Sequence, residues 1–155
     1  NPCPCGYFGH QKIHCECTPE RIARYKSKLS GPLLDRIDVH LQLHFESDLW
    51  QKKGQGESST TIRQRVERCR GIQLQRQGCL NATLHGAALE QHAPLDDSAK
   101  TLLHGAMQRW SWSARTTQRI RKLARTLADM QQNTVIQADH VALAMQYREQ
   151  YELKP

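Results

Sequence analysis

Cysteine is the residue whose type and spacing stand out first in this chain of 155 residues. Four cysteines crowd into its first segment as Cys3-x-Cys5 and, after nine intervening residues, Cys15-x-Cys17. Two pairs of thiolates brought together can complete a tetrahedral zinc site. A short polar segment with almost no apolar residues needs such a cross-link to hold one conformation, and a bound metal supplies it. The pattern therefore predicts a candidate zinc site at Cys3, Cys5, Cys15 and Cys17.

Other interpretations of this segment stay open at the level of sequence. Structural zinc sites usually keep two or more residues between paired cysteines, so a spacing of one is unusual. His10 and His14 are alternative ligands, and four free thiols in a surface loop would need no metal. Disulfides are disfavoured, because the sequence shows no export signal and we expect a reducing, cytoplasmic location. Cys69 and Cys79 are expected to be small buried or half-buried apolar residues.

Several other chemistries lack their residues in this sequence. It has no GxxxxGK[ST] loop to hold nucleotide phosphates, no Ser/His/Asp arrangement and no acidic cluster for magnesium. Lys and Arg outnumber Asp and Glu by 22 to 15, which favours polyanions such as nucleotides or nucleic acids as partners. No apolar run approaches the roughly 20 residues of a membrane span. The residues by themselves do not make an enzyme.

The elements that must position the cysteines and the basic residues are mostly helical. A helix is predicted to begin at Thr18-Pro19-Glu20, where a capping hydroxyl, a proline and an acid follow one another. Strict alternation of apolar and polar residues predicts one half-buried strand over residues 38–45. Residues 46–58 are polar, contain two glycines and indicate a loop. Beyond the loop we expect a bundle of four or five helices. One of them should begin at a cap formed by Asp96 or Asp97 and end at a corner over 111–113. The others are expected over about 59–77, 84–92, 113–131 and 138–150.

Two of these helices carry clear apolar faces. In the helix over 59–77, the residues predicted to point inward are Ile62, Val66, Cys69 and Ile72. In the helix over 113–131, they are Ile120, Leu123, Ala124, Leu127 and Met130. The opposite side of that second helix is basic and is expected to be mostly a solvated face, formed by Arg115, Arg119, Arg121, Lys122 and Arg125. Arg115 is the exception, because a cation in the first turn opposes the helix dipole and suggests a role in binding an anion.

Specific blocks of sequence resemble the ComM/YifB family of magnesium-chelatase-like AAA+ ATPases. The most specific are NPCPCG at residues 1–6, CECTP at 15–19, Arg24-Tyr25 and LSGPLLDRID at 29–38. Ser113-Ala114-Arg115, KLARTLAD at 122–129 and the stretch over 139–148 also fit the family. The matches run along nearly the whole chain, and only residues 46–112 are less characteristic.

The resemblance implies a mainly α fold, an AAA+ C-terminal helical lid preceded by a remnant of the α/β ATPase core. Residues 1–17 would be a Cys-rich insertion after sensor 1, 18–46 the end of the core, 47–58 a linker and 59–155 the lid. Asn1 matches the sensor-1 asparagine. Arg36 matches the arginine finger, which reaches the nucleotide of a neighbouring subunit and stabilises transition-state charge. Arg115 matches the sensor-2 arginine, which contacts the nucleotide of its own subunit.

The resemblance further implies a homo-oligomeric ring, expected to be a hexamer, driven by ATP and Mg²⁺. DNA is the expected substrate, with branch migration or helicase activity during natural transformation. The Walker A and Walker B strands and an N-terminal domain are missing from this sequence, so we expect a fragment that is inactive alone. Two alternative functions stay open: a stand-alone zinc-stabilised nucleic-acid-binding module, and a subunit of a metal chelatase that acts on a porphyrin.

Overall fold

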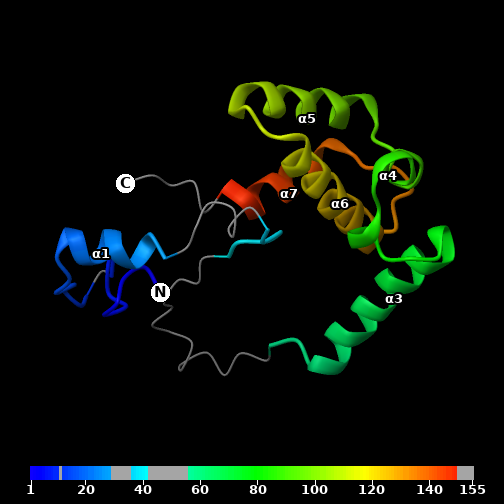
Figure 1. Ribbon diagram of the computed structural model, residues 1–155. Coiled ribbons are helices and arrows are strands. Elements are labelled where there is room, and N and C mark those ends of the chain that lie inside the picture. The colour runs from blue at the N-terminus through cyan, green and yellow to red at the C-terminus, as the bar shows by residue number, and fades with distance from the viewer. Residues whose placement is uncertain (11, 29–35, 42–55, 150–155) are drawn as a thin grey trace. The chain divides into compact units, whose positions relative to one another are not determined.

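The computed structural model describes residues 1–10, 12–28, 36–41 and 56–149. They form two compact units, Asn1–Ile37 and Asp38–Pro155, each considered by itself. In the first unit the described residues contain one helix, α1 (Pro19–Lys26). The helical elements of the second unit are α3 (Ser59–Gln77), the 3-10 turn η1 (Asn81–Thr83), α4 (Gly86–His92), α5 (Asp97–Trp110), α6 (Ala114–Met130) and α7 (Ala138–Glu149) (Figure 1). The prediction of a mainly α fold with a four- or five-helix bundle after residue 58 is confirmed.

Side-chain caps fix where the helices begin. Thr18 accepts the backbone N–H of Arg21 at 3.3 Å, and α1 starts one residue later with Pro19. Three further caps follow the same pattern, at Ser58, Asp96 and Ser113. Each cap satisfies an amide that has no partner within the helix. The starts expected from Thr18, Asp96 and Ser113 are therefore confirmed.

The core of the second unit is built around α6. This helix packs against α7, α3 and η1, and α7 also packs against α5 (Figure 1). A short parallel bridge between Leu95 and Ile136 ties the segment before α5 to the segment before α7. The buried apolar residues form one cluster, comprising Leu84, Leu89, Ala93, Ala99, Leu103, Ala106, Ile120, Ala124, Ala128, Ile136, Val141, Ala144 and Met145.

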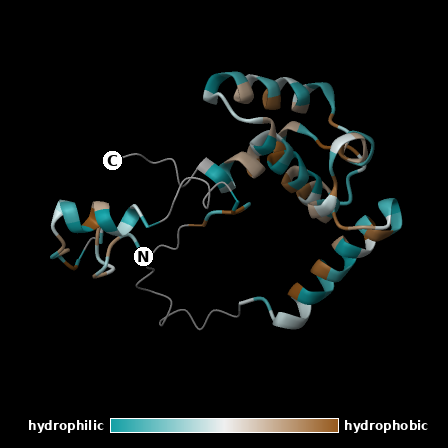
Figure 2. Ribbon diagram, in the orientation of Figure 1, coloured by the Kyte–Doolittle hydropathy of each residue, from teal (hydrophilic) through white to brown (hydrophobic). Residues whose placement is uncertain are grey.

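Helix α3 departs from its predicted burial. Ile62 and Val66 were expected to point inward, but their side chains are 42% and 49% exposed. Cys69 and Gln73, further along, are the buried residues of this helix. Figure 2 shows apolar bands continuing along α3 where it extends past the bundle. The expectation failed because only the second half of α3 meets α6, and periodicity cannot say how far a facing helix reaches.

The predicted strand over 38–45 is not formed in its described part. Residues 38–41 belong to no helix or strand, and residues 42–45 lie outside the described residues. A strand exists through pairing with another strand, whereas the backbone N–H of His40 donates to the carbonyl of Tyr147 in α7 at 2.7 Å. None of the helices that the structure describes is both long and apolar enough to cross a bilayer.

Candidate functional site

The four N-terminal cysteines converge in the first unit. Their sulfur atoms all lie within 4.8 Å of one another. The Sγ of Cys3 lies 3.3 Å from that of Cys5 and 3.6 Å from that of Cys15, and Cys5 and Cys15 are 3.5 Å apart. A tetrahedral metal with bonds of about 2.3 Å to sulfur places its ligand atoms about 3.8 Å apart. The spacing of these sulfurs therefore fits a tetrathiolate metal centre, which we call the cysteine cluster.

A tight turn makes the unusual Cys-x-Cys spacing workable. The backbone N–H of Gly6 donates to the carbonyl of Cys3 at 3.1 Å, and Gly6 has a φ of +87°, a region that favours glycine. His10 does not join the cluster: its Nδ1 accepts the backbone N–H groups of Lys12 and Ile13 at 3.1 and 3.0 Å. Of the open ligand sets, the structure brings together the one made of four cysteines.

The thiols of the cluster differ sharply in acidity. Burial opposes ionisation of Cys3, but contacts from the Cys5 thiol and the backbone N–H of Phe8 lower the pKa of Cys3 to about 6. The backbone N–H of Cys17 favours a thiolate at Cys15, yet burial and the neighbouring thiols Cys5 and Cys3 raise the pKa of Cys15 to about 12. The backbone N–H of Cys5 favours a thiolate at Cys17, yet burial and the neighbouring thiols Cys5 and Cys3 raise the pKa of Cys17. Four thiolates repel one another, and a bound cation removes that penalty.

The three residues expected at a nucleotide site are all exposed. Asn1 lies at the start of the first unit, and Arg36 lies in a turn at its end. Arg115 belongs to the second unit, in the first turn of α6, where Ser113 caps the helix by accepting the N–H of Thr116 at 3.1 Å. The unit that carries Arg115 is thus separate from the unit that carries Asn1 and Arg36.

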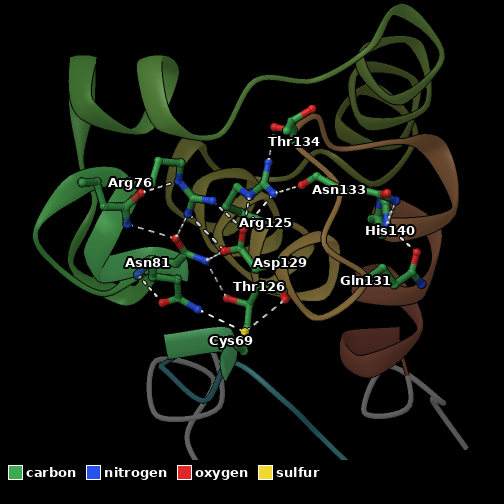
Figure 3. A network of polar contacts seen from close by, with 12 residues as sticks. Cys69, Arg76, Asn81, Arg125, Thr126, Asp129, Gln131, Asn133, Thr134 and His140 are labelled. Carbon is green, nitrogen blue, oxygen red and sulfur yellow. Dashed lines mark hydrogen bonds and ion pairs between the residues drawn. The ribbon is translucent and has the colours of Figure 1, made fainter. Parts of the chain in front are cut away.

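The sequence did not reveal a buried ionic network at the centre of the second unit (Figure 3). The side chains of Arg125 and Asp129, one turn apart on α6, are both 0% exposed and form an ion pair of 2.8 Å. Arg76 of α3 also binds the carboxylate of Asp129, with Nη2 donating to Oδ2 at 3.0 Å. Asn81 of η1 donates to the same oxygen at 2.8 Å. One carboxylate therefore joins α3, η1 and α6.

Arg125 extends the network to the turn after α6. Its Nη1 donates to the carbonyl of Thr134 at 2.8 Å, and its Nη2 donates to the carbonyl of Asn133. Burial lowers the pKa of Arg125, while the hydrogen bond and charge of Asp129 act in the opposite direction. The prediction that Arg125 lies on a solvated face is wrong, because the guanidinium finds a carboxylate and two carbonyls inside the fold.

The other basic residues of α6 also bind partners. Arg121 pairs with Glu90 and donates to the carbonyl of Ala93 at 2.9 Å. Lys122 donates to the carbonyl of Ala82 at 3.0 Å, and Arg119 binds Asp38 at 2.8 Å. These side chains are half-buried. The face that was expected to be solvated therefore contacts α4, η1 and Asp38. Met130, which was expected to point inward, is 46% exposed.

Comparison with known proteins places both parts of the chain in one family. Residues 56–148 match the family described as "Magnesium chelatase, subunit ChlI C-terminal", and residues 1–49 match "Magnesium chelatase, subunit ChlI". The chain is 39% identical over 150 residues to the uncharacterized protein YifB of Escherichia coli. It is 35% identical over 150 residues to the competence protein ComM of Haemophilus influenzae. An uncharacterized protein of Mycobacterium bovis is 35% identical over 153 residues.

These alignments cover 96% of this chain but only 29–30% of the relatives' own lengths. The chain thus spans about three tenths of each of these relatives, and it matches both of the magnesium chelatase regions in order. The chain belongs to the magnesium chelatase family, as a ComM/YifB-like member.

Proposed function

We propose that this chain is the finger-and-lid part of a ring-forming AAA+ ATPase that remodels DNA. ATP and Mg²⁺ would bind in an ATPase core whose last part is residues 18–46. Residues 47–58 would connect this core to the lid, which residues 59–155 would form. The ring would be a homo-hexamer in the cytoplasm. The name of one relative, competence protein ComM, supports a role in competence. Branch migration or helicase activity on DNA during natural transformation is the reaction that we propose for that role.

The observation that carries the proposal is the exposed Arg115 in the first turn of α6. A cation at this position is disfavoured by the helix dipole and becomes favourable when an anion lies nearby. A nucleotide phosphate supplies that anion if Arg115 acts as sensor 2 for its own subunit. Arg36, exposed on the other unit, would be the finger that reaches a neighbour's nucleotide, and Asn1 would be sensor 1.

The function is tested by joining this chain to a nucleotide-binding core and supplying ATP, Mg²⁺ and a branched DNA. We expect ATP hydrolysis and movement of the branch point, measured on gels with labelled strands. A matched reaction with a porphyrin and Mg²⁺ tests the chelatase alternative. Insertion of magnesium without any effect on DNA would contradict the proposal.

For the cysteine cluster we propose zinc, held by Cys3, Cys5, Cys15 and Cys17. Thiolates are soft ligands, and a closed set of four suits a structural zinc ion, which would cross-link the loop and supply no reactive position. The cluster also supports the second candidate function, a zinc-stabilised nucleic-acid-binding module. In either case the ion would hold the first unit together.

Zinc content provides a direct prediction. The purified protein is expected to hold about one zinc per chain, measured by atomic emission, and Cys15→Ser should lose it. Loss of zinc should also remove amide-exchange protection at Gly6, whose N–H is bonded to Cys3 in the turn. Cys79→Ser is the matched control, because Cys79 is a half-buried thiol outside the cluster. Equal zinc in wild type and Cys15→Ser would contradict the assignment.

A further inference from the structure

The loop between the two cysteine pairs exposes two aromatic rings side by side in sequence. Tyr7 is 41% and Phe8 47% exposed, and Ile13 in the same loop is 44% exposed. Gly6 and Gly9 flank the rings, with φ of +87° and +81°, so the chain reverses on both sides of them. Three exposed apolar side chains gathered in one short loop are a feature of surfaces that bind a ligand or a partner.

The exposed rings border a hollow in the surface of about 330 Å³. Phe8, Ile13 and Ile22 contribute apolar walls, while His10 and His14 contribute polar edges. The ring of Tyr7 stands edge-on to that of His10, with centroids 5.8 Å apart, which holds Tyr7 in place. The hollow is therefore lined by aromatic and aliphatic side chains together with polar ones. Such a lining suits a planar ring that carries polar groups on its edge.

One cation contacts the aromatic pair, and the unit around the pair is basic. The Nζ of Lys26 lies 5.3 Å from the centre of the Phe8 ring. Residues 1–28 hold five basic side chains, Lys12, Arg21, Arg24, Lys26 and Lys28, against the two acids Glu16 and Glu20. All five basic residues are exposed. A metal-loaded tetrathiolate would be negative, so attraction for an anion must come from these side chains.

We propose that the aromatic loop (Tyr7, Phe8 and Ile13), together with Lys26 of α1, binds single-stranded nucleic acid. A base would stack on Phe8 or Tyr7, and the phosphates would lie near the cations of α1. Stacking surfaces beside cations are how proteins hold single strands without reading their sequence. The inference rests on the proposed function, in which DNA is the substrate, and names a place where a displaced strand is held.

The test uses the full-length, zinc-loaded protein and a fluorescent oligodeoxythymidine of about 16 nucleotides. Phe8→Ala is expected to weaken binding about 5- to 150-fold, measured by fluorescence anisotropy, as the loss of one stacked base predicts. Phe8→Leu should weaken it similarly, because leucine keeps the apolar bulk and loses the π face. Phe8→Trp should retain binding, with the fluorescence of the added indole quenched by the oligonucleotide. Lys26→Ala should reduce the magnitude of the slope of log K against log salt by about 0.7, the value for one phosphate contact on a single strand.

The possible outcomes distinguish a failure of the aromatic-loop site from a failure of the proposed function. Zinc content is measured for each variant, and Val135→Ala, which removes an exposed apolar side chain of the second unit, is the control. If wild type binds the oligonucleotide and Phe8→Ala binds it equally well, the aromatic loop is not the site and the proposed function stands. If Phe8→Leu binds the oligonucleotide like wild type while Phe8→Ala does not, the apolar bulk of Phe8 supports binding without base stacking, and the inference is overturned. If wild type binds no DNA at low salt, the proposed function itself fails.

Discussion

Arg36→Ala is expected to reduce ATP turnover about 10³- to 10⁵-fold in the assembled ring while leaving nucleotide binding unchanged. An arginine finger stabilises charge that develops on the transferred phosphoryl group, and it contributes little to binding of the ground state. Arg36 is exposed on the first unit, as a residue acting across a subunit boundary must be. Steady-state hydrolysis and fluorescent-nucleotide titration measure the two quantities separately.

Mixing subunits tests whether the finger acts in trans. In the proposed ring, Arg36→Ala subunits would keep their own nucleotide site and would need a finger from a neighbour. Subunits with a disabled nucleotide site still carry Arg36. Mixed rings should therefore hydrolyse ATP although each variant alone does not. Arg63→Ala, which removes an exposed arginine of α3, is the matched control. Normal turnover by Arg36→Ala would refute the finger assignment.

Asp129→Ala is expected to lower the free energy of unfolding of the chain by about 3–5 kcal/mol. The carboxylate is the shared partner of Arg76, Arg125 and Asn81, and the Arg125 side chain is fully buried. Removing the Asp129 carboxylate leaves the guanidinium of Arg125 without its counter-charge inside the fold. The resulting loss of stability is larger than the stability that the ion pair itself contributes. Urea denaturation followed by the tryptophan fluorescence of the second unit measures the change.

A surface pair provides the control for Asp129. Glu57 binds Arg65 through both oxygens, at 2.8 and 2.9 Å, but both side chains are 47% exposed. Glu57→Ala should therefore change the free energy of unfolding by no more than about 1 kcal/mol. Similar losses in the two variants would mean that burial does not set the cost. Asp129→Asn keeps the shape of the side chain and supplies a milder variant if Asp129→Ala does not fold.

The effect of Asp129 should also depend on pH. Burial acts to raise the pKa of this carboxyl, but hydrogen bonds from Arg76, Asn81 and Arg125 lower it overall. A carboxyl with a lowered pKa in the folded state stabilises the fold above its unfolded pKa, and this contribution is lost as the pH falls. The difference in unfolding free energy between wild type and Asp129→Asn should be steady down to about pH 5 and shrink below about pH 4.

Local sequence was sufficient wherever a helix is defined by its own residues. Thr18, Asp96 and Ser113 predicted helix starts to within a residue, because a cap uses a side chain and an amide three positions away. The apolar stripe of α6 likewise predicted the burial of Ile120 and Ala124. These features depend on neighbours in the chain, which a sequence displays directly.

Burial of charge could not be predicted in the same way. Arg125 and Asp129 are one turn apart and follow Ala124 and Ala128, so they border the buried stripe of α6. That position was the available signal, but the same spacing is common in exposed helix pairs. What buries the pair is Arg76 and Asn81, which lie about fifty residues earlier in the sequence. Ile62 and Val66 illustrate the converse, since an apolar stripe alone does not supply the helix that covers it.

The cysteines show most clearly which features the sequence determines and which features depend on the tertiary structure. Their types and spacing by themselves indicated thiolate chemistry and a candidate metal, because soft ligands in pairs are the residues that such a site requires. The sequence left open whether one-residue spacing lets both sulfurs of a pair reach one point, and whether His10 takes part. Only the tertiary structure decided this, by turning the chain at Gly6 and occupying the Nδ1 of His10 with backbone amides. A ligand set is fixed by where backbone turns place side chains, and those turns depend on hydrogen bonds that no spacing rule contains.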